Sequence, residues 1–331
     1  MRLEDHHDQS CHHLWRVRFC RAVHRATDGW RVRVAVRRPN EALFVRPFGV
    51  VGQVEPVLCN IRDDASVRAA MAGADVVVNC VGILAEKGKN RFEAVQAEGA
   101  ARVARIASET GVGRMVHISA IGADMNAESD YAKSKGAGEA GVLEHMSGAV
   151  ILRPSIVFGT EDDFFNRFAG LTRMSLILPV VGGGTMFQPV FVDDVARVAE
   201  MAIKGDVAGG IYELGGPDKE SFRDLMQRML GVVHRRRLVL NMPRWIARLM
   251  ALGFDMAQAM TLGVFTNTVL TRDQVRNLSN DNVVADDAKG FDDLGINPVS
   301  MASVLPDYLW RFRPSGQYDA IKESAQNLRN G

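Results

Sequence analysis

A serine, a tyrosine and a lysine form the clearest chemical pattern in this sequence. Tyr131 and Lys135 stand four residues apart in the run YAKSK, so on a helix both side chains lie on one face. There the ammonium group lowers the pKa of the phenol, and the phenolate can exchange a proton with a substrate hydroxyl while a nicotinamide exchanges hydride. Ser119 ends the run RMVHIS and could hydrogen-bond the substrate oxygen. Tyrosine and lysine at this spacing also occur on ordinary helix surfaces. The serine at the end of the preceding strand makes the pattern more specific for this chemistry.

A pair of arginines indicates which dinucleotide such a site would use. Arg37 and Arg38 directly follow the alternating run Trp30–Val36. In a dinucleotide-binding fold the end of this strand meets the adenosine ribose, where an acid binds the 2′-hydroxyl and an arginine pairs with a 2′-phosphate. Two arginines without an acid favour NADP(H) over NAD, and solvated loop charges are the alternative interpretation.

Four further residues are candidates for binding the same cofactor. Asn60 and Asp63 follow the next apolar run and could cap the adenine. Val81 and Gly82 follow the run DVVVNC, where small residues let a cofactor approach the backbone. The serine, tyrosine and lysine of the catalytic pattern would meet the cofactor as well.

The elements that must position these residues alternate between strands and helices. The predicted strands are Trp30–Val36, Gln53–Cys59, Asp75–Cys80, Arg114–Ser119, Ala149–Leu152 and Ile211–Leu214. The predicted helices are Asp64–Met71, Arg91–Thr110, Tyr131–His145, Asp193–Ile203, Ser221–Val233, Pro243–Met260 and Met301–Phe312. This order predicts an α/β fold with a doubly wound parallel sheet of the Rossmann type. We expect an NAD(P)-binding core over residues 28–205, a smaller C-terminal α+β lobe and tail over 206–331, and an aberrant segment over 1–27.

The composition excludes several classes of protein. The 331 residues hold 40 Lys and Arg against 39 Asp and Glu, so the basic surplus typical of a nucleic-acid binder is missing. No apolar run is long enough to predict a transmembrane helix. The four cysteines lack paired spacing, which favours a reducing compartment without a disulfide framework.

Several of these runs resemble known families. VVNCVG, HIS, YAKSK and RPSIVFG resemble the extended or atypical short-chain dehydrogenase/reductase superfamily, which places Pro154 and Ser155 beside the cofactor as well. RPNEALFVRPFGVVGQVE, EDDFFNRFA, FQPVFVDDVA and YELGGP are similar to a narrower family, the short-chain-dehydrogenase-like accessory subunit of respiratory complex I (NADH:ubiquinone oxidoreductase) and its bacterial relatives. The resemblance covers most of the chain, from Gly29 to Phe312.

This resemblance implies a fold that binds NADPH tightly and has a structural, non-catalytic role. The expected place is the peripheral arm of complex I, close to the membrane and the quinone region, with core subunits of that arm as partners. We expect the cytoplasmic side of a bacterial inner membrane, or the matrix side in a mitochondrion. Two alternatives stay open: an active NAD(P)-dependent epimerase, dehydratase or reductase acting on a sugar nucleotide or similar alcohol, and a cofactor-free binding module.

The N-terminal segment departs from the superfamily, which opens with a strand and a GGxGxxG turn whose amides receive the pyrophosphate. Here Cys11–Ala26 contains no glycine and no apolar strand, and five of the eight histidines fall within the first 24 residues. Their spacing with the cysteines matches no zinc pattern, so we expect no metal site. We hypothesise that this segment is translated in a shifted reading frame. Codons that encode His12–Arg21 can be chosen so that the same bases, read one base later, encode TIFGGSGFVG. With this N-terminal sequence the chain should bind NADP(H) weakly. Apolar and polar residues alternate over Leu14–Phe19, so this run could form a divergent first strand.

Three further features have both a functional and a plainer interpretation. The acids Glu161, Asp162 and Asp163 suggest a metal site, but a charge cluster at a helix N-terminus is favoured. The basic run His234–Arg237 could meet anionic lipid or a partner, or be a solvated loop. The weakly charged stretch Met242–Phe265 fits a helix pair facing a partner or a membrane, with core packing as its rival.

Overall fold

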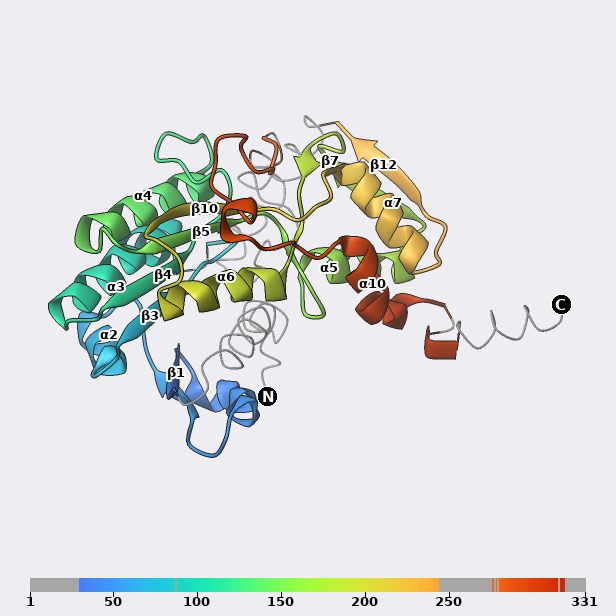
Figure 1. Cartoon of the computed structure of the whole chain (residues 1–331). Coiled ribbons are helices and arrows are strands. Elements are labelled where there is room, and N and C mark those ends of the chain that lie inside the picture. The colour runs from blue at the N-terminus through green and yellow to red at the C-terminus, as the bar shows by residue number, and fades with distance from the viewer. Residues whose placement is uncertain are drawn as a thin grey trace.

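A four-stranded parallel sheet lies at the centre of the cofactor domain (Figure 1). The computed structural model describes residues 30–86, 88–243, 276, 278, 280–314 and 316–318. The strands lie in the order β10-β5-β4-β3, with bounds Gly210–Leu214, Val150–Pro154, Arg114–Ile118 and Val76–Asn79. A separate parallel pair joins β1 (Val32–Val36) to β2 (Val54–Leu58). The expected α/β fold with a parallel, doubly wound sheet is confirmed.

Helices cover both faces of this sheet. The helices on one face are α2 (Asp64–Met71), α3 (Glu98–Glu109) and α4 (Asp130–His145), and α6 (Val192–Lys204) lies on the other. Strand β5 shows the division, since Ile151 packs with side chains of the three helices while Val150 and Leu152 pack with α6. The strands are therefore buried on both faces, which explains their continuous apolar sequences.

Small residues let α3 and α4 approach each other closely. A Cβ atom at Gly141 would lie 2.6 Å from the Cβ of Ala101, and one at Gly138 would overlap the carbonyl oxygen of Gln96. Glycine removes both collisions, so the Ala- and Gly-rich sequence of α4 follows from packing. This contact fixes where Lys135 lies along α4.

A second lobe packs around a core of aromatic and aliphatic side chains. Its main elements are α5 (Phe164–Met174), β7 (Ile177–Val181), α7 (Phe222–Val232), β12 (Leu238–Met242) and α10 (Met301–Leu309). Its core includes edge-to-face pairs such as Phe158–Phe165 and Phe164–Phe165. Strands β7 and β12 pair in parallel, and short pairs join β8 (Met186–Phe187) to β11 (Glu220–Ser221) and β6 (Val157–Phe158) to β9 (Val190–Phe191). No helix in the described part of the chain is long and apolar enough to cross a membrane.

The predicted elements differ from the observed ones at a few ends. The helix expected over Arg91–Thr110 opens with a π-helical turn, Glu93–Ala97, at the point where Gly138 presses on the Gln96 carbonyl. The helix expected over Met301–Phe312 ends at Leu309, and the 3-10 turn η4 (Trp310–Phe312) follows.

The acidic pair Asp193 and Asp194 lies inside the first turn of α6, because the cap residue is Phe191. Strand β12 was not predicted. Residues 1–27 and the helix expected over Pro243–Met260 lie outside the described residues, apart from Pro243.

Candidate cofactor and catalytic site

The structure brings Ser119, Lys135 and Gly82 together at the carboxyl ends of β3 and β4. Ser119 directly follows β4 and is buried, and its hydroxyl has no hydrogen-bond partner among the described residues. Lys135 is buried on α4, and its Nζ donates a hydrogen bond to the Ile118 carbonyl at 3.2 Å. A Cβ at Gly82 would lie only 3.3 Å from Lys135 Nζ, so the glycine keeps the space beside the ammonium group open.

Tyr131 lies in the first turn of α4, one helical turn before Lys135. Ser129 caps this helix by accepting a hydrogen bond from the Ala132 amide at 3.4 Å. The tyrosine ring is half-buried and meets Phe92 edge to face, with 5.9 Å between ring centroids. The cap and the aromatic contact fix the direction of the phenol, as a proton-transfer residue requires.

A neutral histidine lies next to this group. His117, on β4, is fully buried, and its Nδ1 lies 3.2 Å from the Asn79 amide nitrogen. Burial, with a smaller effect from the Lys135 charge, lowers the pKa of His117 to about 3. An amide nitrogen can only donate, so Nδ1 accepts and the ring hydrogen lies on Nε2. That nitrogen has no partner within the described residues.

Gln96 completes the polar lining from the π-helical turn before α3. Its Nε2 donates to the Ser134 hydroxyl at 3.1 Å, and its buried Oε1 has no partner among the described residues. A Cβ at Gly82 would lie 3.5 Å from this oxygen. Buried polar atoms are costly unless hydrogen-bonded, so Gln96 Oε1 and Ser119 Oγ fit a ligand with polar groups of its own. No sequence pattern points to Gln96, because its place in the site depends on its contacts with Gly82 and α4.

The residues expected to hold the adenosine end lie at the ends of the first two strands. Arg37 and Arg38 are exposed after β1, and Arg38 pairs with Glu41 at 2.9 Å. Asn60 follows β2 and accepts a hydrogen bond from the Arg62 amide at 3.2 Å. Asp63 precedes α2 with an exposed side chain that does not cap the helix. Of the two arginines, Arg38 is therefore partly engaged, whereas Arg37 is exposed and stays a candidate for the predicted phosphate contact.

Two residues of the RPSIVFG run serve the packing of the chain. Pro154 ends β5, and its carbonyl accepts a hydrogen bond from the Ile121 amide at 3.1 Å. The buried hydroxyl of Ser155 binds the Oδ1 of Asn282 at 2.6 Å and the carbonyl oxygen of that residue at 3.0 Å. The Ser155 hydroxyl is therefore engaged with a distant segment, and the Pro154 carbonyl bonds to the loop that follows β4.

A partly buried ion network joins α4 to strands β5 and β10 of the central sheet. Arg153 on β5 binds Glu139 of α4 through Nε and Nη2, at 2.9 and 2.6 Å, and reaches Glu213 of β10 at 3.4 Å. The hydrogen bonds to Glu139 raise the pKa of the guanidinium. Sequence patterns gave no sign of this network, since its three members are far apart in the chain.

The acidic run before α5 has a structural role. Buried Asp162 accepts hydrogen bonds from the Gly159 and Asn166 amides, at 3.2 and 3.1 Å, and from the Tyr308 hydroxyl. Burial raises the pKa of this carboxyl to about 6. The described residues contain no group of three or more potential ligands that could hold a metal ion.

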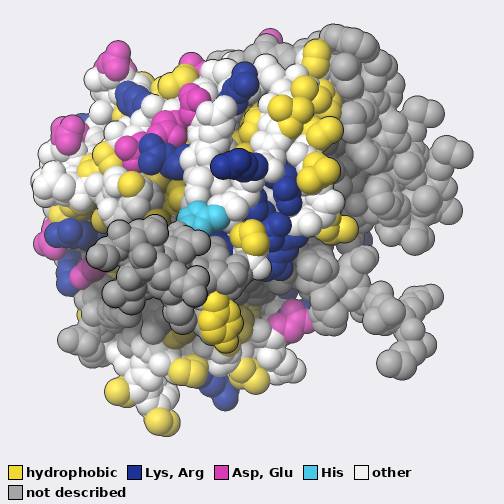
Figure 2. Space-filling model, turned by 90° about the vertical axis from the view of Figure 1, so that its right-hand side faces the viewer, with side chains coloured by type: hydrophobic (Ala, Val, Ile, Leu, Met, Phe, Trp, Pro, Cys, Tyr) yellow, Lys and Arg dark blue, Asp and Glu magenta, His cyan; other side chains and the backbone are white. Residues whose placement is uncertain are grey.

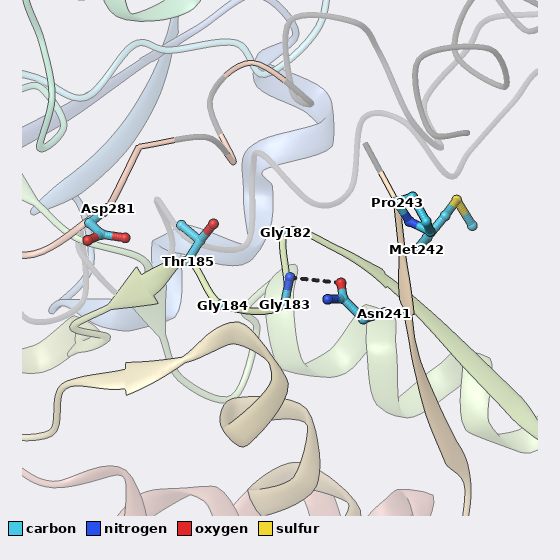
Figure 3. A pocket seen from close by; sticks show the side chains of 8 residues that line it. All are labelled: Gly182, Gly183, Gly184, Thr185, Asn241, Met242, Pro243 and Asp281. Carbon is cyan, nitrogen blue, oxygen red and sulfur yellow. Dashed lines mark hydrogen bonds between the residues drawn. The ribbon is translucent and has the colours of Figure 1, made fainter. Parts of the chain in front are cut away.

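A cavity of about 290 Å³ opens in the second lobe (Figure 3). It is lined by Gly182, Gly183, Gly184, Thr185, Asn241, Met242, Pro243 and Asp281. The Asn241 carboxamide faces the glycine loop and accepts a hydrogen bond from the Gly183 amide at 3.2 Å. None of the predicted catalytic or cofactor-binding residues lines it.

Comparisons with known proteins show what this chain is similar to. Residues 20–155 match the NAD(P)H-binding family model. The chain is 33% identical over 274 residues to the alpha subcomplex subunit 9 of mitochondrial NADH dehydrogenase (ubiquinone) from Arabidopsis thaliana, covering 81% of this chain and 68% of that protein. The Rattus norvegicus subunit is 31% identical over 280 residues, covering 82% and 71%. Ceramide reductase of Caulobacter vibrioides is 31% identical over 220 residues, covering 66% and 68%.

Solved structures share the fold at low identity. A dTDP-glucose 4,6-dehydratase from Streptomyces venezuelae has a TM-score of 0.66 at 20% identity, covering 90% of this chain and 93% of that one. An NADPH-dependent quinone oxidoreductase from Escherichia coli has a TM-score of 0.65 at 13% identity, covering 88% and 94%. The fold and the family model therefore define an NAD(P)-binding protein with a Rossmann-type fold. Within that class, the chain belongs to the family of the alpha subcomplex subunit 9 of NADH dehydrogenase (ubiquinone), respiratory complex I.

Proposed function

We propose that this chain is an accessory subunit of respiratory complex I whose fold is stabilised by bound NADP(H). The observation that carries the proposal is the similarity to the complex I subunit over 81% of this chain, which extends beyond the cofactor domain into the second lobe. A protein that shared only the cofactor chemistry would need no similarity there. The proposed partners are core subunits of the peripheral arm, at the cytoplasmic side of a bacterial inner membrane.

The site supports a bound dinucleotide by its donor set. The exposed Arg37 guanidinium offers a charged partner for a 2′-phosphate, which favours NADP(H). Gly82 leaves room beside Lys135 and Gln96, and Ser119 Oγ supplies a buried hydroxyl without a partner among the described residues. When bound, the nicotinamide would supply hydride chemistry. The chain's own residues would orient that ring and keep water from it.

A second candidate is an NADP(H)-dependent reductase. The similarity to ceramide reductase and the presence of Ser119, Tyr131 and Lys135 in one site favour it. In such an enzyme Tyr131 would exchange the proton with the substrate oxygen and Ser119 would hydrogen-bond that oxygen. Lys135, buried and held by Ile118, would keep positive charge near the phenol.

A replacement strain separates the two functions. The chromosomal copy is deleted and replaced with the wild-type gene or with Tyr131→Phe, and NADH:quinone activity is measured in washed membranes. The accessory role predicts that deletion lowers this activity and that Tyr131→Phe restores it as well as wild type does. Full activity after deletion, or a soluble pool that turns over NADPH only when Tyr131 is present, would overturn the accessory role.

Denaturing the purified native protein measures its cofactor. Release of one NADP(H) per chain is expected from the Tyr131→Phe protein as well as from wild type. Release of no nucleotide from the native protein would instead support a cofactor-free binding module.

A further inference from the structure

Six arginines lie together on the outer surface of the second lobe. They come from α5, from the turn between α7 and β12, and from the segment after α10, and we call them the arginine cluster: Arg173, Arg235, Arg236, Arg237, Arg311 and Arg313. Figure 2 shows Lys and Arg side chains gathered near the centre of this face, beside a group of hydrophobic side chains. The whole chain has a formal charge of only +1, so the cluster is a local concentration of charge.

Backbone carbonyls hold five of the six guanidinium groups in place. Four bonds are Arg173 to Arg311 O at 2.6 Å, Arg235 to Phe312 O at 2.8 Å, Arg237 to Thr172 O at 2.9 Å, and Arg313 to Val232 O at 2.9 Å. The fifth group, that of Arg311, donates to Thr160 O at 3.1 Å and to Asn166 Oδ1 at 2.7 Å. Two of the guanidinium groups also lie over the Phe312 ring, at 4.9 and 5.2 Å from its centroid. None of the six forms an ion pair with a carboxylate in the described part of the chain.

The positive charges in the cluster repel one another. Burial, together with Arg237 and Arg173, lowers the pKa of Arg235. A guanidinium has five N–H donors, and a carbonyl bond uses one or two of them. The others stay available to an anion, and the planar fork of arginine suits phosphate oxygens.

The turn that carries three of the arginines has a left-handed residue. His234 has φ 53°, although glycine is the usual residue there. The His234 amide donates to Gly231 O at 3.2 Å and the Arg235 amide to Leu230 O at 3.1 Å, the two bonds of a Schellman motif. The backbone therefore turns directly after α7, and this turn places Arg235–Arg237 at the surface next to Arg173.

An exposed apolar strip, formed by the end of α5, the start of β7 and β12, adjoins the cluster. Its members are Met174, Leu176, Ile177, Leu238 and Leu240, of which Met174 is 94% exposed and Leu176 is 73% exposed. Leu238 pairs with Ile177 in the β7–β12 register, so both belong to one sheet surface. The strip begins where the cluster ends, since Met174 follows Arg173 and Leu238 follows Arg237.

We propose that the arginine cluster and the apolar strip form a docking surface for an anionic phospholipid membrane. The arginines would bind lipid phosphates, and the strip would enter the boundary between headgroups and acyl chains. An acidic protein segment would satisfy the arginines but would leave the adjoining apolar strip in water. A bilayer surface offers phosphate and hydrocarbon side by side, which matches the two kinds of side chain. The surface shares no residue with the cofactor site, so it does not depend on the proposed function.

Vesicle co-sedimentation of the purified full chain tests this docking surface. The probes are vesicles of phosphatidylcholine alone and vesicles of equal parts phosphatidylcholine and phosphatidylglycerol. We expect binding to the anionic vesicles only, decreasing with added salt. The variant Arg173→Gln/Arg236→Gln/Arg311→Gln should weaken binding roughly 100-fold, since each basic residue near an anionic surface contributes about fivefold.

Two further variants keep the outcome interpretable. Arg31→Gln/Arg46→Gln/Arg91→Gln removes the same charge from exposed arginines of the cofactor domain and should bind as wild type does. Met174→Ser/Leu238→Ser keeps all the charge and should also weaken binding, because the strip contributes apolar area. Equal binding to both vesicle types, or equal loss in both arginine variants, would overturn the proposal. Binding to soluble polyglutamate without binding to vesicles would replace the membrane with an acidic protein partner.

Discussion

Asn79 donates a hydrogen bond from its amide nitrogen to Nδ1 of His117, across 3.2 Å of fully buried space between β3 and β4. Asn79 also accepts a hydrogen bond from the Val81 amide at 3.1 Å. One asparagine thus fixes the histidine ring and the backbone that leads to Gly82. Lys135 reaches the next residue of β4, because its Nζ donates a hydrogen bond to the Ile118 carbonyl.

The neutral state of His117 predicts a pH dependence of stability. Its pKa is about 3 in the folded protein and near its ordinary value of 6.5 in the unfolded chain. The unfolded chain therefore gains a proton first, so stability is present above pH 6.5 and is lost as pH falls toward 3. As pH falls through this range, the free energy of unfolding of wild type should decrease relative to that of His117→Gln. The difference between the two proteins should change by up to about 1.4 kcal/mol per pH unit. Urea titrations of both proteins measure this difference, and parallel curves would contradict it.

Asp162 predicts a pH dependence of stability opposite to that of His117. Its pKa is raised to about 6, so the folded protein holds this proton where the unfolded chain has lost it. The stability from this group is present below the ordinary pKa of 3.8 and is lost as pH rises through 6. Asp162→Asn removes the titration and keeps an acceptor for Tyr308. The stability of wild type relative to the variant should therefore decline between pH 4 and pH 6, and thermal melts across that range would show it.

Gly82→Ala tests the open space beside Lys135. The new methyl group would lie 3.3 Å from Nζ and 3.5 Å from Gln96 Oε1, which is tight for both. We expect roughly tenfold weaker NADP(H) binding, about 1.4 kcal/mol, by isothermal titration calorimetry. Gly148→Ala is the control, because a Cβ at Gly148 meets nothing within 4 Å. Equal weakening in both variants would mean that the loss is not local.

Arg37 and Arg38 predict unequal effects on the choice of cofactor. Arg38 is already paired with Glu41, whereas Arg37 is exposed after β1 and forms no ion pair with any described residue. Arg37→Ser should weaken NADPH binding roughly 10- to 100-fold, as expected for a charge-assisted phosphate contact, and leave NADH binding nearly unchanged. Arg38→Ser should do less. Fluorescence titration with the two nucleotides measures the ratio, and an equal loss for both nucleotides would count against a phosphate contact.

The reading-frame hypothesis predicts a gain of affinity by restoration. A chain in which His12–Arg21 is replaced by TIFGGSGFVG would carry the glycine-rich turn that receives a pyrophosphate. It should bind NADPH at least tenfold more tightly than the chain as written, or about 1.4 kcal/mol. Mass spectrometry of the N-terminal peptides of the native protein gives an independent answer. If neither the peptides nor the second frame of the gene contains the motif, the hypothesis is wrong.

The sequence by itself determined the class of fold, because strand and helix periodicities are local. Helix α2 has its predicted bounds, Asp64–Met71, and the apolar run DVVVNC forms β3 with burial on both faces. The four-residue spacing in YAKSK placed Tyr131 and Lys135 on α4. The hydrogen bond from Lys135 Nζ to the Ile118 carbonyl joins α4 to the end of β4, which Ser119 directly follows.

Only the tertiary structure decided which distant residues share a site. Gln96 reaches Gly82 because two glycines let α3 and α4 approach closely, and no local pattern encodes that contact. The histidine of the HIS run is neutral mainly because it is buried on β4, which lies between β5 and β3. The charge of Lys135, eighteen residues away in sequence, has a smaller effect in the same direction. The arginine cluster joins segments more than sixty residues apart, and the sequence revealed only the run within one of them. Electrostatic environment and close packing depend on neighbours in space, and these are set when the elements dock.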